Sequence, residues 1–378
     1  MDWKSRAAAL AADTVHASSR WHAPITEIPR HEFVPRWWQA DRDRSRWTLR
    51  DGVSDPDRWL DTAYANRTIV TRLGALHADH ADPTDRPTGN PTSSSTLPCL
   101  VVAMYRQAMI TDGAETLCVT GTGYGTALLA HRLGDRHVTS VDVDPYLVDT
   151  AADRLARVGR HPHVQVCDIT GPLPGAYDRI VATVGLPGVP TSWLAALRPG
   201  GRLVTNLGGT GLVIAADATP DGGARGQVTE ERAGFMVTRS GQDYPPSLDT
   251  THAWTDEGDD VGIGRYPVVS VQDTWGLMSA FALEAPGVHH AYRVAENDIR
   301  TAVMVHEDGS WARATGRYGE PPTLHQSGPQ RLWTVLDDIR SRWLSDGGLP
   351  EYGATAVIDP DGTLHLCRGA WKATISPA

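Results

Sequence analysis

The chain has 378 residues, with 45 Asp and Glu against 35 Lys and Arg, and a formal net charge of −10. This length is sufficient for two domains with separate cores, and the acidic balance argues against a nucleic-acid partner, whose phosphates are bound by clusters of Lys and Arg. The 4 cysteines are scattered and no histidine spacing suits a metal, so we expect no disulfide framework and no metal site.

No stretch of the sequence reaches membrane-spanning length, and the polar, Ala-rich start Met1–Asp13 has no long apolar run. Both features predict a cytoplasmic protein without a membrane partner. The oligomeric state is not readable from the sequence, and a monomer is favoured.

The first region, residues 1–112, is expected to be an N-terminal helical and loop extension. Its expected parts are a leader helix at Met1–Asp13, an aromatic-rich segment from Phe33 to Trp59, a polar loop at Ala81–Pro98 and an apolar helix at Cys99–Ile110. Core packing is the default reading of the aromatic residues, with a peptide-binding surface second. The Ser/Thr run at 92–96 is either a solvated linker or a functional loop before the apolar helix.

A glycine-rich turn follows, in the stretch Leu117–Gly125, between a short apolar strand and the helical run Thr126–Leu133. Gly121 and Gly123 allow the backbone to approach a ligand, although glycines also serve turn geometry alone. The next expected strand ends at Asp142, about twenty residues farther on, where a carboxylate meets ribose hydroxyls in doubly wound folds. The pattern predicts a nucleotide-cofactor site.

Strands and helices continue to alternate after Asp142. We expect a helix at Pro145–Val158, a strand at Val164–Val166 closed by Asp168, a strand at Tyr177–Val184, and then a helix, a Pro-Gly-Gly turn and a strand within Trp193–Val204. This order predicts an α/β fold with a Rossmann-like class I core that binds S-adenosylmethionine (SAM), at residues 113–210. A dehydrogenase fits less well, because the third glycine follows the second by only two residues.

Beyond residue 210 the pattern changes to short strands separated by Gly, Asp and Pro turns. Strands are expected at Gly211–Ala216 and Gly226–Thr229, a helix at Pro329–Asp346 and a hairpin at Ala354–Leu366. We interpret residues 211–378 as a C-terminal α+β domain that recognises the substrate.

Several short motifs together resemble the protein-L-isoaspartate O-methyltransferases. They occur in the order found in that family: Ile28–Pro35, Ala63–Asn66, Thr92–Pro98, the Gly-Thr-Gly turn, Tyr177–Thr183 and Leu197–Val204. Further motifs resemble the C-terminal extension of actinobacterial methyltransferases encoded with ribosomally made, modified peptides, including lanthipeptide and graspetide systems: Ala233–Met236, Gly309–Ala312, Gly328–Trp333 and Arg342-Trp343.

The resemblance implies a SAM-dependent carboxyl O-methyltransferase that releases S-adenosylhomocysteine. The expected partner is a modified, cyclised precursor peptide, of which an Asp side chain is esterified. The following backbone nitrogen then displaces methanol, and the resulting succinimide (aspartimide) persists or hydrolyses to isoaspartate. A general isoaspartyl repair enzyme and an inactive peptide-binding homologue are the alternatives.

The resemblance also implies roles for individual residues. Gly121, Thr122, Gly123 and Tyr124 would line the SAM methionine and ribose, Asp142 with the adjacent Val143 would bind the ribose, and Asp168 with Ile169 would meet the adenine. Thr96 and Ser95 are the catalytic candidates, because they match the hydroxyl loop that holds the reacting carboxylate. Tyr64, Asn66, Ser94 and Thr183 are the substrate-binding candidates.

Two features depart from the family pattern. An acid usually ends the first core strand, and here Leu117 or Val119 stands in its place, depending on the alignment. One glycine of the turn is also displaced.

Overall fold

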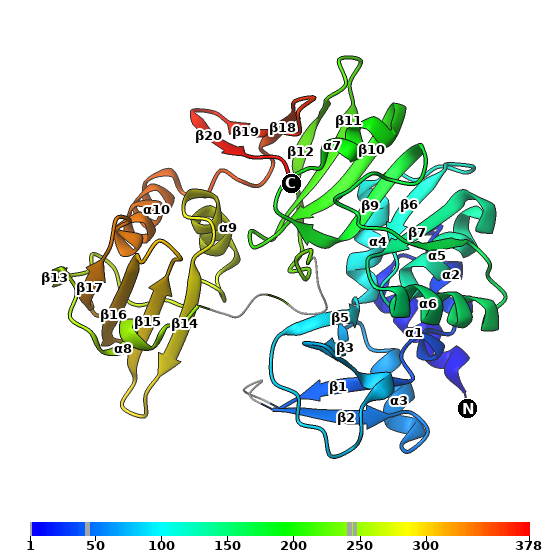
Figure 1. Cartoon of the computed structure of the whole chain (residues 1–378), viewed down its shortest axis with the longest axis horizontal. Helices are drawn as coiled ribbons and strands as arrows, with labels where there is room; N and C mark the ends of the chain where they lie inside the picture. Colours follow the sequence, from blue (N-terminus) through cyan, green and yellow to red (C-terminus); the bar gives the residue numbers. More distant parts are fainter. Residues whose placement is uncertain (1, 42–45, 240–243, 245–247) are drawn as a thin grey trace.

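The computed structural model describes residues 2–41, 46–239, 244 and 248–378. Its strands form three sheets, shown in Figure 1: a small N-terminal sheet, a central sheet of ten strands, and a five-stranded sheet in a separate lobe. Met1 of the expected leader helix and residues 42–45 of the aromatic-rich segment lie outside the described residues.

The N-terminal region combines short helices with a sheet in the order β2-β1-β3-β4, on which β5 pairs with β3. Helix α1 begins after Asp2, whose side chain accepts a hydrogen bond from the backbone N–H of Ser5, as N-cap residues do. The elements are α1 (Trp3–Thr14), α2 (His22–Glu27), η1 (Arg30–Phe33), β1 (Arg36–Ala40), β2 (Trp47–Asp51), α3 (Pro56–Ala63), β3 (Ile69–Leu73), β4 (Leu76–His77), η2 (Ala78–His80), β5 (Pro91–Ser95) and α4 (Pro98–Gln107).

The Ser/Thr run differs from expectation, because part of it is a strand and not a loop. Strand β5 pairs antiparallel with β3, with Ile69 opposite Ser95 and Val70 opposite Ser94. Its inward hydroxyls are satisfied, since Thr92 Oγ1 donates to the carbonyl of Gly74 at 2.6 Å. A polar sequence therefore forms a strand here because the adjacent strand and local acceptors satisfy its polar groups.

The central sheet has the order β20-β19-β18-β12-β11-β10-β9-β6-β7-β8. Its half from β10 to β8 is parallel, which confirms the expected Rossmann-like core, and the other half is antiparallel. The strands are β6 (Thr116–Val119), β7 (Val138–Asp142), β8 (His163–Val166), β9 (Tyr177–Leu186), β10 (Leu197–Leu207), β11 (Leu212–Ala218), β12 (Ala224–Arg232), β18 (Thr355–Ile358), β19 (Leu364–Arg368) and β20 (Trp371–Ile375).

Both faces of the parallel half are buried, as the near-continuous apolar runs of its strands require. Val181 and Val204 belong to the core cluster that includes α4 and α5, whereas their neighbours Ile180 and Leu203 belong to the opposite cluster with Trp193 of α7. The helices and short 3-10 turn that connect these strands are α5 (Tyr124–Leu133), η3 (Asp135–His137), α6 (Pro145–Arg157) and α7 (Thr191–Ala196).

The central sheet extends past the boundary expected at residue 210. Strands β11 and β12 continue it beyond β10, and β18 to β20 return to it at the end of the chain, with Gln227 of β12 paired to Thr355 of β18. Residues 212–232 and 355–375 therefore belong to the same sheet as the core.

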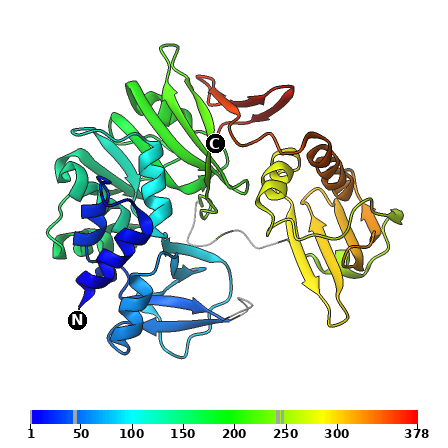
Figure 2. The same ribbon diagram turned by 180° about the vertical axis from the view of Figure 1, so that it is seen from behind.

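The separate lobe lies between β12 and β18 in the sequence. Its antiparallel sheet has the order β13-β17-β16-β15-β14, and its elements are α8 (Thr251–Thr255), β13 (Asp260–Ile263), α9 (Trp275–Glu284), β14 (His289–Val294), β15 (Ile299–Val305), β16 (Trp311–Arg317), β17 (Thr323–Ser327) and α10 (Leu332–Asp346). Its core includes Phe281, Ala312 and Trp333. In Figure 2, which shows the molecule from behind, the lobe stands beside the core with α9 nearest to it.

Helix α9 joins the lobe to the central sheet. Ser279 Oγ donates a buried hydrogen bond of 2.6 Å to the carbonyl of Thr210, in the turn before β11. A Cβ on Gly211 would lie 2.6 Å from the ring of Trp275, so this glycine allows the helix to approach the turn. Within the described part of the chain, no helix is long and apolar enough to span a membrane.

Candidate active site

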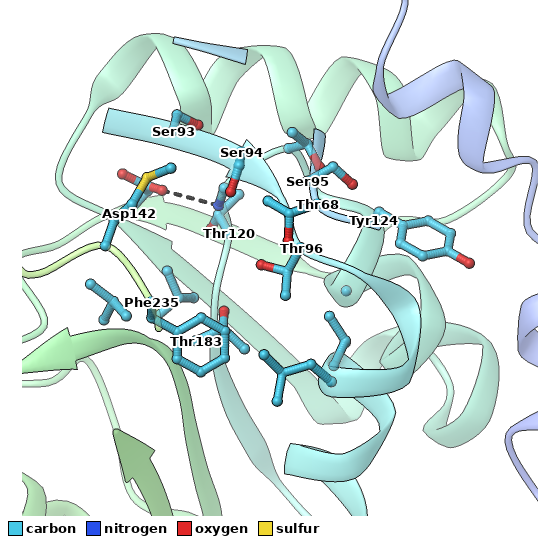
Figure 3. A pocket seen from close by; sticks show the side chains of 18 of the residues that line it. Thr68, Ser93, Ser94, Ser95, Thr96, Thr120, Tyr124, Asp142, Thr183 and Phe235 are labelled. Carbon is cyan, nitrogen blue, oxygen red and sulfur yellow. Dashed lines mark hydrogen bonds between the residues drawn. The ribbon is translucent and has the colours of Figure 1, made fainter. Parts of the chain in front are cut away.

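A cavity of about 540 Å³ opens at the carboxyl ends of β6, β7 and β9. This edge of a parallel sheet is where ligands bind in open α/β folds. Figure 3 shows Ser94, Thr96 and Thr120 close together, with Asp142 beside them and Thr183 and Phe235 across the open space. The cavity is lined by these predicted site residues: Ser94, Ser95, Thr96, Gly121, Thr122, Tyr124, Asp142, Val143, Asp168, Ile169 and Thr183.

The glycine turn is held to the next strand by a carboxylate. The backbone N–H of Gly121 donates to Asp142 Oδ2 at 3.0 Å, and the N–H of Asp144 donates to Asp142 Oδ1 at 3.1 Å. Gly121 has φ +51° and Gly123 has φ +90°, a region that favours glycine. Both glycines are therefore required by the turn itself, whichever ligand the cavity receives.

Asp142 is enclosed, and burial raises its pKa while its two backbone N–H donors lower it. A carboxylate oxygen has lone pairs for more than one donor. Since each oxygen accepts one backbone bond, both retain capacity for hydroxyl donors in the cavity. Val143, the next residue, is 36% exposed and lines the same cavity.

Asp168 and Ile169 follow β8 and form another part of the cavity wall. Asp168 Oδ1 accepts hydrogen bonds from the backbone N–H and the hydroxyl of Thr170, at 2.9 and 2.7 Å. The carbonyl of Ile169 accepts a bond of 2.7 Å from Trp193 Nε1. These bonds fix the loop after β8, and both the carboxyl residue and the apolar residue border the cavity.

The hydroxyls of β5 divide between two directions. Ser93 Oγ lies 3.2 Å from Thr71 Oγ1, in a buried pair. Ser95 is 2% exposed, and its Oγ lies 3.5 Å from the Arg30 guanidinium. Ser94 and Thr96 are half-buried at the cavity. Ser94 and Thr96, which directly follows β5, therefore present hydroxyls to the cavity, whereas the Ser95 hydroxyl faces Arg30.

Arg30 is hydrogen-bonded both to the end of β5 and to the segment between α3 and β3. Its buried guanidinium donates to the carbonyl groups of five residues, at 2.9 to 3.3 Å: Ala63, Ala65, Arg67, Ser95 and Thr96. Burial lowers the pKa of Arg30 to about 10. The sequence reasoning quoted this residue within a family motif and gave it no role. The only sign of its role in the sequence was its position in the motif Ile28–Pro35, directly after a proline.

Two predicted substrate residues, Tyr64 and Asn66, are not among the residues that line the cavity. Tyr64 Oη lies 2.8 Å from His31 Nδ1, and its ring stacks on Trp3. Asn66 Oδ1 accepts a hydrogen bond of 3.1 Å from the backbone N–H of Cys99, in the first turn of α4. Their side chains thus pack the N-terminal core and hold a helix end.

Two predicted cofactor residues sit at the edge of the cavity. Gly123 precedes α5, and a Cβ there would lie 3.1 Å from Ala151 and 3.4 Å from Phe33, away from the cavity lining. Tyr124 reaches the lining but is buried, with the Arg30 guanidinium 5.4 Å from its ring centroid. Gly123 therefore shapes the turn, and Tyr124 connects the cavity wall to Arg30.

The two candidates for the position of the family's missing acid, Leu117 and Val119, differ in their surroundings. Val119 ends β6 and lines the cavity, whereas Leu117 is fully buried inside the sheet. Among the described residues, no group of three or more His, Cys, Asp or Glu side chains is arranged to hold a metal ion.

One wall of the cavity was missed by the sequence reasoning. Residues 233–239, which we call the strap, follow β12 and cross to the end of β9. The N–H of Gly185 donates to the carbonyl of Met236, and the N–H of Thr238 donates to the carbonyl of Gly185, both at 2.8 Å. Phe235 and Arg239 of the strap line the cavity.

Part of the chain is similar to known proteins. Residues 82–231 match the profile of the protein-L-isoaspartate(D-aspartate) O-methyltransferase (PCMT) family. The chain is similar to the protein-L-isoaspartate O-methyltransferases of Rhodopseudomonas palustris, with 37% identity over 29% of this chain and 51% of the relative, and of Pyrococcus abyssi, with 34% identity over 34% and 59%. The chain thus spans about half the length of these curated relatives.

Two solved structures were also compared. One is a protein-L-isoaspartate O-methyltransferase, with a TM-score of 0.49, 15% identity and full coverage of both chains. The other is a Plasmodium falciparum homologue in complex with S-adenosyl-L-homocysteine, with a TM-score of 0.44, 10% identity and coverage of 64% of this chain and 100% of that one. Residues 82–231 are thus similar in sequence to the protein-L-isoaspartate O-methyltransferase family.

Proposed function

We propose that this protein is a SAM-dependent carboxyl O-methyltransferase that acts on an aspartyl or isoaspartyl side chain of a peptide. The observation that carries the proposal is that two kinds of group line one cavity. The Gly121–Asp142 turn is typical of a nucleotide site, and the hydroxyl residues Ser94 and Thr96 line the same cavity next to it. The family match supports the same reaction and the same cofactor.

The residues present fit SAM. Asp142 retains acceptor capacity for two ribose hydroxyls, and Asp168 with Ile169 offers an acceptor and an apolar surface for adenine. A Cβ placed on Gly121 would lie 3.6 Å from the carbonyl of Ser94, so the turn packs closely against the end of β5. Bound SAM would supply an electrophilic methyl group.

For this methyl transfer the protein mainly has to position the two reacting groups. A side-chain carboxylate is already ionised at neutral pH, and it needs no general base to attack a methyl group. We propose that the Thr96 and Ser94 hydroxyls donate hydrogen bonds to this carboxylate and hold it in line. Apolar side chains such as Phe235 and Leu100 exclude water, which strengthens these bonds.

We further propose that the substrate is a modified, cyclised precursor peptide and that the strap and the separate lobe recognise its shape. A repair enzyme accepts many damaged sequences and needs an open cleft, whereas this cavity has a wall contributed by the strap. A preorganised ring also loses less conformational entropy on binding than a linear chain. The product would be a methyl ester that closes to a succinimide and then hydrolyses to isoaspartate.

Two alternatives have specific observations in their favour. General repair of isoaspartyl residues is favoured by the similar curated proteins, which are named protein-L-isoaspartate O-methyltransferases. An inactive peptide-binding homologue is favoured by the end of β6, where Leu117 or Val119 stands in place of the family's acid and the cavity-lining residue is Val119. The cavity and its intact Asp142 turn favour activity over the second alternative.

Intact-mass spectrometry after incubation with SAM tests the proposal. Three peptides are compared: a co-encoded precursor already cyclised, its linear form, and a simple isoaspartyl peptide. A gain of one methyl group on the cyclised peptide alone, followed by loss of methanol, is the expected result. Methylation of the isoaspartyl peptide alone would identify a repair enzyme, and no methylation together with no binding of S-adenosylhomocysteine would overturn the proposed activity.

A further inference from the structure

Arg239, at the end of the strap, is a cation with unused hydrogen-bond donors at the cavity. Its terminal nitrogen Nη1 donates a hydrogen bond of 3.0 Å to the carbonyl of Thr92, which places the guanidinium next to the start of β5. Its Nε is buried and has no hydrogen-bond partner among the described residues. In that part of the chain no carboxylate lies within the 4.0 Å of an ion pair with it.

The other cation that lines the cavity is engaged elsewhere. Of the residues that form the described lining, only Arg232 and Arg239 carry a positive charge. The Arg232 guanidinium lies over the ring of Tyr352, 5.1 Å from its centroid. Arg239 has no such partner, so its charge acts on the cavity itself. The Arg239 charge also lowers the pKa of Asp142, against the larger effect of burial.

A guanidinium with unused donors is suited to a carboxylate, which it binds through parallel N–H bonds. The sulfonium of SAM is positive and would be repelled. The two ligands of the proposed reaction each bring a carboxylate, namely the methionine carboxylate of SAM and the carboxylates of the peptide. The donors, the charge and the partial burial of Arg239 all match that chemical group.

We propose that Arg239 is a carboxylate-binding residue of the cavity. This inference rests on the proposed function, since it assigns a recognition group within the same site. Arg239 lies outside the residues that match the family, 82–231. It belongs to the strap, so the region beyond the family domain would contribute directly to ligand binding.

The test combines calorimetry and kinetics on the full-length protein. Arg239→Gln removes the charge, Arg239→Lys keeps the charge without the planar donor pair, and Arg225→Gln is the control. Arg225 is exposed on β12 and does not line the cavity, so this variant loses the same charge elsewhere. Titrations use S-adenosylhomocysteine and 5′-methylthioadenosine, which lacks the amino-acid carboxylate. Methylation rates use the peptide that the wild-type protein accepts.

We expect Arg239→Gln to lower the affinity for one of the two carboxylate ligands by at least about tenfold. The affinity of Arg239→Lys should be intermediate, and that of Arg225→Gln should equal the wild-type value. A weaker affinity for S-adenosylhomocysteine, with unchanged binding of 5′-methylthioadenosine, would assign the cofactor carboxylate. A higher KM for the peptide, with unchanged binding of S-adenosylhomocysteine, would assign a peptide carboxylate.

If Arg239→Gln leaves both the affinity for S-adenosylhomocysteine and the KM for the peptide unchanged, the inference about Arg239 is overturned and the proposed function is not. An equal loss for S-adenosylhomocysteine and 5′-methylthioadenosine would also overturn it, because that result would indicate a general disturbance of the cavity. Failure of the wild-type protein to bind S-adenosylhomocysteine would overturn the proposed function, and the inference with it.

Discussion

The carboxylate of Asp142, at the end of β7, accepts a hydrogen bond of 3.0 Å from the backbone N–H of Gly121, in the turn after β6. One side chain therefore fixes the shape of the glycine turn and also faces the cavity. This double role makes the carboxylate difficult to replace.

Asp142→Asn should weaken binding of S-adenosylhomocysteine by roughly 10- to 100-fold. The neutral amide oxygen of Asn is a poorer acceptor for ribose hydroxyls than a carboxylate oxygen, and the amide NH₂ group cannot accept a hydrogen bond. Isothermal titration calorimetry measures the change. The matched control is Asp178→Asn, since Asp178 bonds to the backbone N–H of Glu115 at the opposite end of the strands. Wild-type affinity in Asp142→Asn would remove this residue from the cofactor site.

Thr96→Ala should lower turnover by roughly tenfold or more and leave the affinity for S-adenosylhomocysteine unchanged, because its proposed hydrogen-bond partner is the substrate carboxylate. Thr96→Ser should recover most of the rate. Thr71→Ala serves as the control, as Thr71 lies on the adjacent strand β3, pairs with the Ser93 hydroxyl and does not line the cavity. An equal loss of rate and cofactor affinity would place Thr96 in the cofactor site.

Arg30→Met should destabilise the protein by about 3 kcal/mol, because it leaves several buried carbonyl groups without a donor. Denaturant unfolding, followed by tryptophan fluorescence, measures the free energy. Arg67→Met is the control, since the Arg67 side chain is exposed and bonds only to Thr62 among the interactions of the described residues. A change below 1 kcal/mol in Arg30→Met would show that water replaces the guanidinium.

Glu351→Gln should stabilise the protein at alkaline pH and have little effect in acid. Burial and the nearby carboxylate of Glu284 raise the pKa of Glu351 from 4.5 to about 7, against the opposing charges of Arg342 and Arg368. An acid whose pKa is raised by folding contributes stability below about pH 4.5 and loses it as the pH rises through 7. The Gln side chain does not ionise, so the variant keeps its stability as the pH rises.

The predicted gain for Glu351→Gln at pH 8 is about 2 kcal/mol, from thermal or denaturant unfolding at pH 5 and pH 8. Glu230→Gln, at an exposed position of β12, should be neutral at both values. A gain that is the same at pH 5 and pH 8 would contradict the assignment to ionisation.

The glycine turn and its acid were predictable because their signals are local. The strand, the two glycines with positive φ and the acid at Asp142 lie within a short stretch, and each follows from backbone geometry that few residues allow. The structure brings Gly121 and Asp142 into contact as that pattern predicts. Proposed roles for Tyr64 and Asn66 came from the family motif alone, and the structure places both outside the cavity lining.

The parts that sequence reasoning missed depend on contacts between distant segments. Strand β5 has a polar sequence, and it forms because β3 supplies its backbone partners. The strap has no periodic pattern, and its position depends on two hydrogen bonds to Gly185. The pairing of Gln227 with Thr355 is likewise invisible to local patterns, which is why the expected boundary at residue 210 divided a single sheet.

The lobe leaves and re-enters the central sheet at two neighbouring points. The backbone N–H of Val228 donates to the carbonyl of Ala354 at 2.9 Å, and the N–H of Gly353 donates to the carbonyl of Val228 at 3.0 Å. A short turn between the same two strands would close the sheet equally well, so the strap and lobe form an exchangeable module. A chain with the same central sheet could therefore carry a longer, shorter or different segment between these two points without a change in the order of the strands.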